Sequence, residues 1–244
     1  MPLPVFILSL EDAAERRAPL VEAFQARGVP FEMWHAVDGR NGLAPKYEKM
    51  IDRGATQRNL GRQMGNAEYG CALSHHLIYR AILERDLDAA IILEDDAIVG
   101  KQFFDFLSTA ATPNCDLLLL DHAHALVSRT DRMKFDDTIV AYRCKSSPML
   151  TTGYLVTRNG AARLAEGTTP ISAVADWPDE ITRMRTYALT PRLVDHPDVE
   201  TAASDIRDNR KQFPLVKKRR DPKRFLALGY WKKTYYKLLG KWLS

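Results

Sequence analysis

A short apolar run in this chain ends on three adjacent carboxylates, Glu94, Asp95 and Asp96. The run before them, residues 89–93, has the length and composition of a buried strand. Adjacent carboxylates repel one another and lose solvation where the chain packs, so three together require a compensating partner. Hard oxygen ligands of this type suit Mg²⁺ or Mn²⁺, ions that keep several waters and bridge to substrate phosphates. The triplet therefore predicts a divalent-cation site, and the alternative is a solvated turn that caps the next helix.

The elements that precede the triplet would place it at the edge of a sheet. Residues 3–10 are apolar in the manner of a strand that is covered on both faces. A helix follows, which residues 9–12 would cap and Gly28 would end, and residues 31–37 form a second strand. This strand–helix–strand order predicts a parallel, Rossmann-like sheet, in which ligands gather at the carboxyl ends of the strands. The residues expected at or near that edge are Ser9, Arg16, Arg17, Asp38 and Asp96.

Periodicity predicts the remaining elements. Residues 66–85 have helical spacing and contain His75, and a histidine on a helix is more often structural than catalytic. Residues 40–66 are polar and weakly periodic, so we expect a long loop, either a flap over a substrate or a surface excursion. Helices are expected around 103–107, over 159–165 and from 176 to about 187, strands over 116–120, 152–157 and 189–194, and a hairpin within 125–147.

Composition indicates a folded body with a basic tail. The chain has 244 residues, of which 45% are hydrophobic and 27% charged, with no leading signal segment and no apolar run that could span a bilayer. Its cysteines, Cys71, Cys115 and Cys144, have no metal-ligand spacing and fit reduced, mostly buried thiols. Residues 217–244 contain ten Lys and Arg against one Asp, a net charge of +9, so the rest carries −5. We therefore expect a cytoplasmic protein whose tail contacts an anionic surface.

The tail itself predicts an amphipathic helix. Apolar residues recur at helical steps from Leu228 to Trp242, and lysines occupy the other side. Such a helix suits the headgroup region of an anionic membrane, and the alternative is a helix packed on the body with its lysines in water. No nucleic-acid motif accompanies the lysines and the body is acidic, so we do not expect nucleic acid as a partner. The predicted organisation is a domain over residues 1–214 and a tail over 215–244.

Several motifs follow one another in a specific order and spacing. They are Val5 to Leu10 with Glu15-Arg16-Arg17, Ala36-Val37-Asp38-Gly39, Glu68 to His75, Ile91 to Ala97, Gly153 to Val156, Asp176, and Ser204-Asp205-Ile206. Together, over about residues 3–207, they resemble glycosyltransferase family 25, the lipopolysaccharide and lipooligosaccharide galactosyltransferases. The resemblance implies an α/β, GT-A-like, Rossmann-type three-layer fold with a mostly parallel sheet. It also implies a UDP-sugar donor, commonly UDP-galactose, a divalent metal (Mn²⁺ or Mg²⁺), a glycan or glycolipid acceptor, and inversion at the anomeric carbon.

The resemblance also assigns roles to residues. The acidic triplet looks like the family's equivalent of the Asp-X-Asp motif, which makes Asp96 a metal ligand, with His196 as a further ligand. Asp176 occupies the family's late aspartate position and is the expected catalytic base, with Asp179 and Glu180 as alternatives that could instead be helix N-terminal acids. The positions expected to bind the nucleotide-sugar are Ser9, Leu10, Arg16, Arg17, Asp38, Ser74, Glu94 and Asp95.

Two features depart from the family pattern. Thr152-Gly153-Tyr154 stands where relatives commonly have a Thr-His-Ala-Tyr-like segment, and the segment between Asp121 and Thr151 matches no motif. The leading expectation is a metal-dependent inverting galactosyltransferase on the inner face of the cytoplasmic membrane. The alternatives are a transferase of glucose or another hexose, and a catalytically silent relative that binds a glycan; the intact triplet argues against the silent relative.

Overall fold

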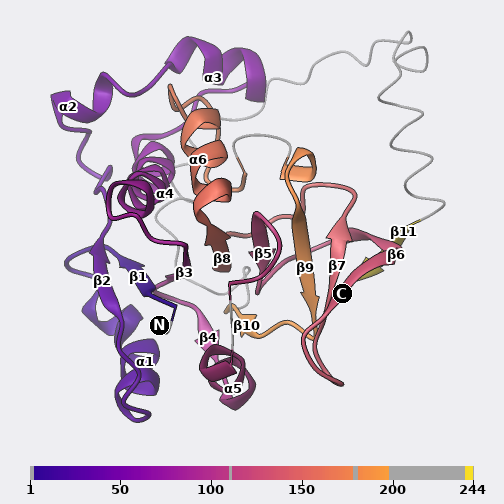
Figure 1. The fold of residues 1–244 in the computed structure, drawn as a ribbon. Coiled ribbons are helices and arrows are strands. Elements are labelled where there is room, and N and C mark those ends of the chain that lie inside the picture. Colours follow the sequence, from indigo (N-terminus) through magenta and orange to yellow (C-terminus); the bar gives the residue numbers. More distant parts are fainter. Residues whose placement is uncertain (1–2, 110–111, 178–180, 198–239, 244) are drawn as a thin grey trace, which may run out of the picture.

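The computed structural model of the protein describes residues 3–109, 112–177, 181–197 and 240–243, and most of its strands belong to one nine-stranded sheet (Figure 1). The sheet order is β11-β6-β7-β9-β5-β8-β3-β1-β2, and β10 pairs separately with β4. The strands are β1 Val5–Ser9, β2 Glu32–His35, β3 Ala89–Glu94, β4 Ile98–Val99, β5 Leu117–Leu119, β6 Ala125–Lys134, β7 Val140–Cys144, β8 Gly153–Thr157, β9 Thr186–Thr190, β10 Val194–Asp195 and β11 Gly240–Leu243. The helices are α1 Ala14–Gln25, α2 Pro45–Glu48, α3 Arg53–Leu60, α4 Asn66–Glu84, α5 Lys101–Thr109, α6 Arg158–Gly167 and a 3₁₀ turn, Ile181–Arg183.

The sheet is mixed, with one dominant strand direction. β1 pairs in parallel with β2 and β3, and β5 pairs in parallel with β9. The other five pairings are antiparallel, because β8 runs against β3 and β5, β7 against β6 and β9, and β11 against β6. Six of the nine strands therefore point the same way, and the carboxyl ends of β1, β3 and β5 meet at one edge. The antiparallel β8 lies between β3 and β5, a reversal that the strand pattern of the sequence did not indicate.

Helices cover both faces of the sheet, which explains why its strands are apolar throughout. In β1, Val5 and Ile7 pack into one core with Phe24 of α1 and Phe103 of α5. Their neighbours on the strand point the other way and pack into a second core with α4 and α6. Alternating side chains are thus buried on opposite faces, as expected for a sheet with helices on both sides. The predicted α/β class with three GT-A-like layers is confirmed.

The segment expected as a long loop contains two short helices. α2 begins at Pro45, and α3 is capped by Asp52, whose side chain accepts a hydrogen bond from the Ala55 amide at 2.7 Å. α3 ends at Gly61, which adopts the left-handed conformation (φ 71°) that favours glycine. The expectation of a long loop over residues 40–66 is therefore wrong, because four- and eight-residue helices are too short to give a clear apolar period.

The prediction of a helix from residue 176 to about residue 187 is also wrong for the part of this segment that the structure describes. A three-residue 3₁₀ turn covers Ile181–Arg183, and Tyr187 lies in strand β9. Thr186 and Tyr187 have strand propensity, and pairing of β9 with both β5 and β7 decides the outcome. The expected cap of α1 differs as well, since that helix begins at Ala14 without a side-chain cap.

The end of the tail belongs to the sheet. Lys241 and Trp242, which the amphipathic pattern placed on a helix, lie in β11 and pair with β6. The rest of the tail, from 215 to 239, and the domain boundary at 214 lie outside the described residues. No helix among the described segments is both long enough and apolar enough to cross a membrane.

Candidate active site

A pocket opens where β1 and β3 end, beside the amino-terminal half of α4. It is lined by Leu8, Ser9, Leu10, Arg16, Ala36, Val37, Asp38, Gly39, Arg40, Ala67, Cys71, Ser74, Glu94, Asp95 and Asp96. This set includes most of the residues expected to bind a nucleotide-sugar, and it includes Asp96. The exception is Arg17, which does not line the pocket and instead donates to the carbonyl oxygens of Leu10 (2.9 Å) and Glu11 (3.2 Å).

Asp95, which directly follows β3, links this strand to α1 through an ion pair with Arg16. Its carboxylate, only 2% exposed, accepts a hydrogen bond from Ser9 Oγ at 2.8 Å. The Arg16 guanidinium contacts both carboxylate oxygens, at 2.7 and 2.9 Å. Burial raises the pKa of Asp95, and the charge of Arg16 opposes that shift. Arg16 remains 42% exposed, so it can also meet a ligand in the pocket.

Asp96 carries an excess of negative charge. Burial, together with the charges of Glu94 and Asp95, raises the pKa of Asp96 to about 6. Arg16 is the cation that ion-pairs with the triplet among the described residues, and it pairs with Asp95. Three carboxylates facing one guanidinium leave the pocket wall in need of a further positive charge.

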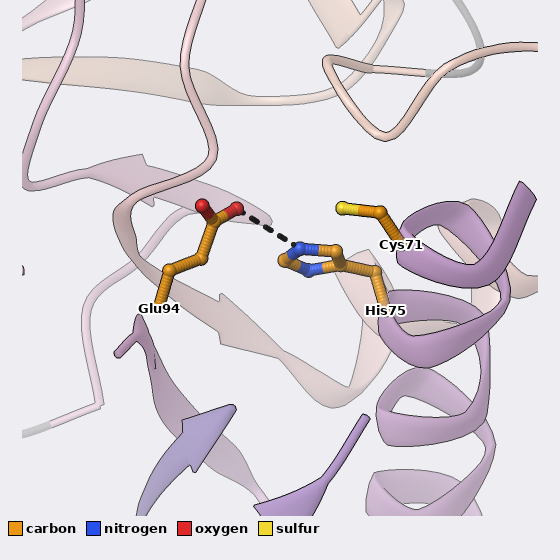
Figure 2. A group of neighbouring side chains, drawn as sticks. All are labelled: Cys71, His75 and Glu94. Carbon is orange, nitrogen blue, oxygen red and sulfur yellow. Dashed lines mark hydrogen bonds and ion pairs between the residues drawn. The ribbon is translucent and has the colours of Figure 1, made fainter. Parts of the chain in front are cut away.

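Glu94 is held in one orientation by His75 of α4 and by Thr151, which precedes β8. Its Oε1 lies 3.2 Å from His75 Nε2 of α4 (Figure 2) and accepts a hydrogen bond from Thr151 Oγ1 at 2.6 Å. His75 is fixed in turn by its Nδ1, 2.7 Å from the Tyr154 hydroxyl, which lies 3.2 Å from the Tyr79 hydroxyl. Burial raises the pKa of Glu94, but the His75 and Thr151 contacts outweigh it and the net shift is downward. Glu94 is therefore ionised and oriented before any ligand arrives.

Asp176 lies in a second hollow next to the pocket. This hollow is lined by Glu68, Cys71, Glu94, Thr151, Val174, Ala175 and Asp176. Cys71 and Glu94 line both spaces, so the two are neighbours across these side chains. The charge of Asp176 contributes to the raised pKa of the Cys71 thiol, after burial and the charge of Glu94. The fold thus brings the late aspartate close to the acidic triplet.

Trp177, next to Asp176, is 6% exposed and packs edge-on against Tyr154 with ring centroids 5.3 Å apart. Of the two roles open to this indole, stacking on a sugar or packing in the core, the structure has the second.

Two residues expected to bind the nucleotide-sugar, Ser74 and Asp38, form hydrogen bonds within the pocket wall. Ser74 Oγ accepts a hydrogen bond from the Val37 amide at 2.8 Å, which fixes α4 against the pocket wall. Gly70 permits this close approach, because a Cβ there would lie 2.5 Å from the Val37 carbonyl oxygen. Asp38 accepts two hydrogen bonds from the Arg40 side chain, at 3.0 and 2.7 Å, and these bonds lower the pKa of Asp38.

His196 lies in a different cluster from Asp96. Its Nδ1 is 2.8 Å from Asp121 Oδ2, and Arg192 donates to the other oxygen of Asp121 at 3.2 Å. Asp195 completes this group, and Arg192 also pairs with Asp195 at 3.3 Å. The structure therefore does not group the two expected metal ligands.

The sequence assigned no functional role to three residues at the site: Arg40, which lines the pocket, Thr151, which lines the second hollow, and His75, which contacts Glu94. His75 ends the Glu68 to His75 motif, but a histidine on a helix predicts a structural role. Arg40 directly follows the Asp38-Gly39 pair, so its position was a usable signal. Thr151 had no signal, because its contact with Glu94 spans 57 residues of sequence.

The fold is that of a GT-A-like α/β protein with a carboxylate-lined pocket, and the comparisons give the family. The chain belongs to glycosyltransferase family 25 (LPS biosynthesis protein), whose family model matches residues 3–178. That range contains both hollows and Asp176, and ends before His196 and the tail. The resemblance inferred from the motifs is confirmed.

The relatives include glycosyltransferases of bacteria. The chain is 28% identical over 166 residues to the lacto-N-neotetraose biosynthesis glycosyltransferase LgtE of Neisseria meningitidis serogroup B, with 62% of this chain and 56% of LgtE covered. It is 26% identical over 211 residues to LgtB of N. meningitidis serogroup A, with 77% and 72% covered. The match thus spans little more than half of LgtE.

Solved structures are only distantly similar. A197 from STIV aligns over 82% of this chain and 87% of its own, with 15% identity and a TM-score of 0.40. A similarity of this size adds no argument about function.

Proposed function

We propose that this family 25 protein transfers a hexose, galactose in the first instance, from a UDP-sugar to a glycan or glycolipid acceptor of bacterial lipopolysaccharide or lipooligosaccharide, with inversion at the anomeric carbon. The observation that carries the proposal is the acidic triplet at the wall of a pocket that also presents Arg16. The names of the relatives LgtE and LgtB, both glycosyltransferases of lacto-N-neotetraose biosynthesis, support the acceptor class.

The donor set of the pocket fits Mn²⁺ or Mg²⁺. Glu94 is held by His75 and Thr151, and Asp95 by Arg16, so Asp96 is the carboxylate whose charge is least compensated. We assign Asp96 as the metal ligand; His196 would have to exchange its contact with Asp121 to join it. When bound, the ion would offset the charge of the departing diphosphate.

The protein's own residues bind and orient the donor. Asp95 holds Arg16 at the pocket, where the guanidinium fork suits a diphosphate. Asp38, kept ionised by Arg40, would accept hydrogen bonds from ribose or uracil. Ser9 and Ser74 fix the walls, Ser9 through Asp95 and Ser74 through the Val37 amide.

Asp176 is the proposed catalytic base. It would accept the proton of the acceptor hydroxyl while that oxygen bonds to the anomeric carbon from the face opposite the diphosphate, and UDP would leave with the electrons of the broken bond. Its hollow adjoins the donor pocket across Cys71 and Glu94, which supports placing the acceptor there. Asp176 lines the neighbouring hollow and not the donor pocket. The acceptor hydroxyl that it deprotonates would therefore reach the anomeric carbon from the side away from the diphosphate, as inversion requires.

The test is a screen of UDP-sugars for thermal stabilisation of the full chain, followed by an assay of UDP release. We expect UDP-galactose to raise the melting temperature with Mn²⁺ present and a chelator to remove both the shift and the turnover. Stabilisation by UDP-glucose alone would move the proposal to a glucosyltransferase. An absence of stabilisation and turnover with every UDP-sugar would end it.

We also propose that the basic tail holds the enzyme at an anionic membrane surface, on the inner face of the cytoplasmic membrane. The support is the charge of residues 217–220, Lys217-Lys218-Arg219-Arg220, since a cluster of basic residues binds acidic headgroups. Replacing these four by Gln should reduce sedimentation with anionic liposomes, whereas Gln at Lys46, Lys49, Lys101 and Lys134 should not. Equal sedimentation of the two variants would contradict the proposal. Substitution is preferable to deleting the tail, which would also remove β11.

A further inference from the structure

Three side chains of different chemistry converge at the boundary between the two hollows. Cys71 and His75 lie one helical turn apart on α4, and Glu94 ends β3. The sulfur, imidazole nitrogen and carboxylate oxygen that they offer all lie within 4.8 Å of one another. Figure 2 shows the thiol, the imidazole and the carboxylate facing a common space.

The spacing of this group matches that of ligands around a tetrahedral metal. Zinc binds imidazole nitrogen and carboxylate oxygen at about 2.0–2.2 Å, which separates two such ligands by roughly 3.3 Å in a tetrahedral arrangement. His75 Nε2 and Glu94 Oε1 are 3.2 Å apart. The Cys71 sulfur lies within 4.8 Å of a ring nitrogen of His75 and of a carboxylate oxygen of Glu94, so a side-chain movement would complete the third bond.

The surroundings of the group also fit a metal site. The Tyr154 hydroxyl lies 2.7 Å from His75 Nδ1 and orients the ring, and Thr151 donates to Glu94 at 2.6 Å. Outer contacts of this kind fix the orientation of metal ligands. Cys71 and Glu94 line both hollows, so an ion can enter from either.

The second cluster of possible ligands, Asp121, Asp195 and His196, is less suited to a metal ion. Arg192 forms ion pairs with both of its carboxylates, at 3.2 and 3.3 Å, so one of their two negative charges is already offset. Among the described residues, no Lys or Arg forms an ion pair with Glu94.

We propose that Cys71, His75 and Glu94 form a Zn²⁺ site, separate from the hard-metal ligand Asp96, and that an ion bound there inhibits the enzyme. Thiolate and imidazole favour zinc over Mn²⁺ or Mg²⁺, which prefer oxygen ligands. Bound zinc would draw the Glu94 carboxylate toward Cys71 and occupy the passage between the donor pocket and Asp176. The binding site stands independently of the proposed function, and only the inhibition rests on it.

Burial raises the pKa of the Cys71 thiol, so the free protein holds a neutral thiol. A cysteine binds a metal as the thiolate, and metal binding at Cys71 therefore releases a proton to solvent.

The direct test uses Co²⁺ as a spectroscopic substitute for zinc in the full chain. We expect a thiolate-to-cobalt charge-transfer band that Zn²⁺ abolishes by displacement. Cys71→Ser should lack the band, whereas Cys144→Ser, which alters a buried thiol of β7 that lines neither hollow, should retain it.

A variant outside the ligand set separates a metal site from a folding defect. Tyr154→Phe keeps all three ligands and loses the hydroxyl that orients His75, so the band should persist while the cobalt affinity falls about 10-fold. Absence of the band in the parental protein, or its persistence in Cys71→Ser, would overturn the proposal.

Inhibition is measured as UDP release at saturating Mn²⁺ with increasing Zn²⁺, relative to each variant's own zinc-free rate. The parental protein and Cys144→Ser should be inhibited at lower zinc concentrations than Cys71→Ser. Equal inhibition of all three would refute the inhibitory role. If no UDP-sugar is turned over, the proposed function fails while the cobalt band still decides the site.

Discussion

Two carboxylate clusters lie at the same edge of the sheet, after β3 and after β5, and they differ in how their charge is balanced. The first contains Glu94, Asp95 and Asp96 with one paired guanidinium, that of Arg16. The second is built around Asp121, which is fully buried and contacted by both Arg192 and His196. The first lines the pocket at the ends of β1 and β3, and the second does not line that pocket. An uncompensated cluster open to a pocket suits a cationic ligand, whereas a compensated, buried one stabilises the fold.

The largest expected effect is on turnover by Asp96→Asn. An amide lacks the charge with which Asp96 would hold the proposed metal, so UDP release should fall about 10³-fold. The measurement is UDP release from the donor that the thermal screen selects, with Mn²⁺. Asp195→Asn, in the second cluster, serves as the matched control and should retain turnover. Comparable activity of Asp96→Asn and the parental protein would remove the distinction between the clusters.

Next in size is Asp176→Asn. Loss of a general base should reduce kcat at least about 10²-fold, while the KM for the donor changes little because Asp176 lies outside the donor pocket. Asp179→Asn is the control for the neighbouring acid. A loss seen with Asp179→Asn and not with Asp176→Asn would move the base to the alternative position.

Stability should change in opposite directions in the two clusters. Asp121→Asn leaves Arg192 and His196 without their buried partner and should lower the free energy of unfolding by about 2 kcal/mol. Asp96→Asn should raise it at about pH 7.5, by up to about 2 kcal/mol, because burial and neighbouring charges raise the pKa of Asp96 to about 6.

The sign of the Asp96 effect depends on pH. A carboxyl whose folded pKa exceeds its unfolded pKa stabilises the fold below the unfolded value and loses that contribution as pH rises through about 6. The advantage of Asp96→Asn should therefore vanish below about pH 4, near the pKa of an unperturbed Asp. Denaturant unfolding across this range measures it, and a variant less stable than the parental protein at neutral pH would contradict the charge excess.

The smallest effect concerns the orientation of Glu94. Tyr154→Phe removes the hydroxyl that fixes His75 and should lower kcat by roughly 10-fold. Because His75 and Tyr79 lose a buried hydrogen-bond partner, the free energy of unfolding should also fall, by about 1 kcal/mol. Thr186→Val, which removes a buried hydroxyl bonded to the Ile181 carbonyl away from the pocket, is a control for the loss of a hydroxyl as such. Equal kinetics for the two variants would show that His75 needs no positioning.

Prediction from sequence succeeded where one local pattern sufficed. The apolar runs before Ser9 and Glu94, and the helical spacing of residues 66–85, identified β1, β3 and α4 and hence the parallel half of the sheet with its edge. Prediction failed where the secondary structure depends on pairing between strands that are far apart in the sequence. The sequence near Tyr187 contains acids and a proline that suggest a helix, but strand β9 forms there because it fits between β5 and β7.

The sequence by itself determined the family motifs, the both-sided burial of the central strands and the acidic triplet, since each depends on neighbouring residue types. Only the tertiary structure decided the partners of the carboxylates. His75 reaches Glu94 because α4 packs across the sheet, and Asp121 meets Arg192 and His196 from more than 70 residues away. The sequence gives the charge of each side chain. Whether an opposite charge compensates it depends on distance and burial, which arise only when the chain folds.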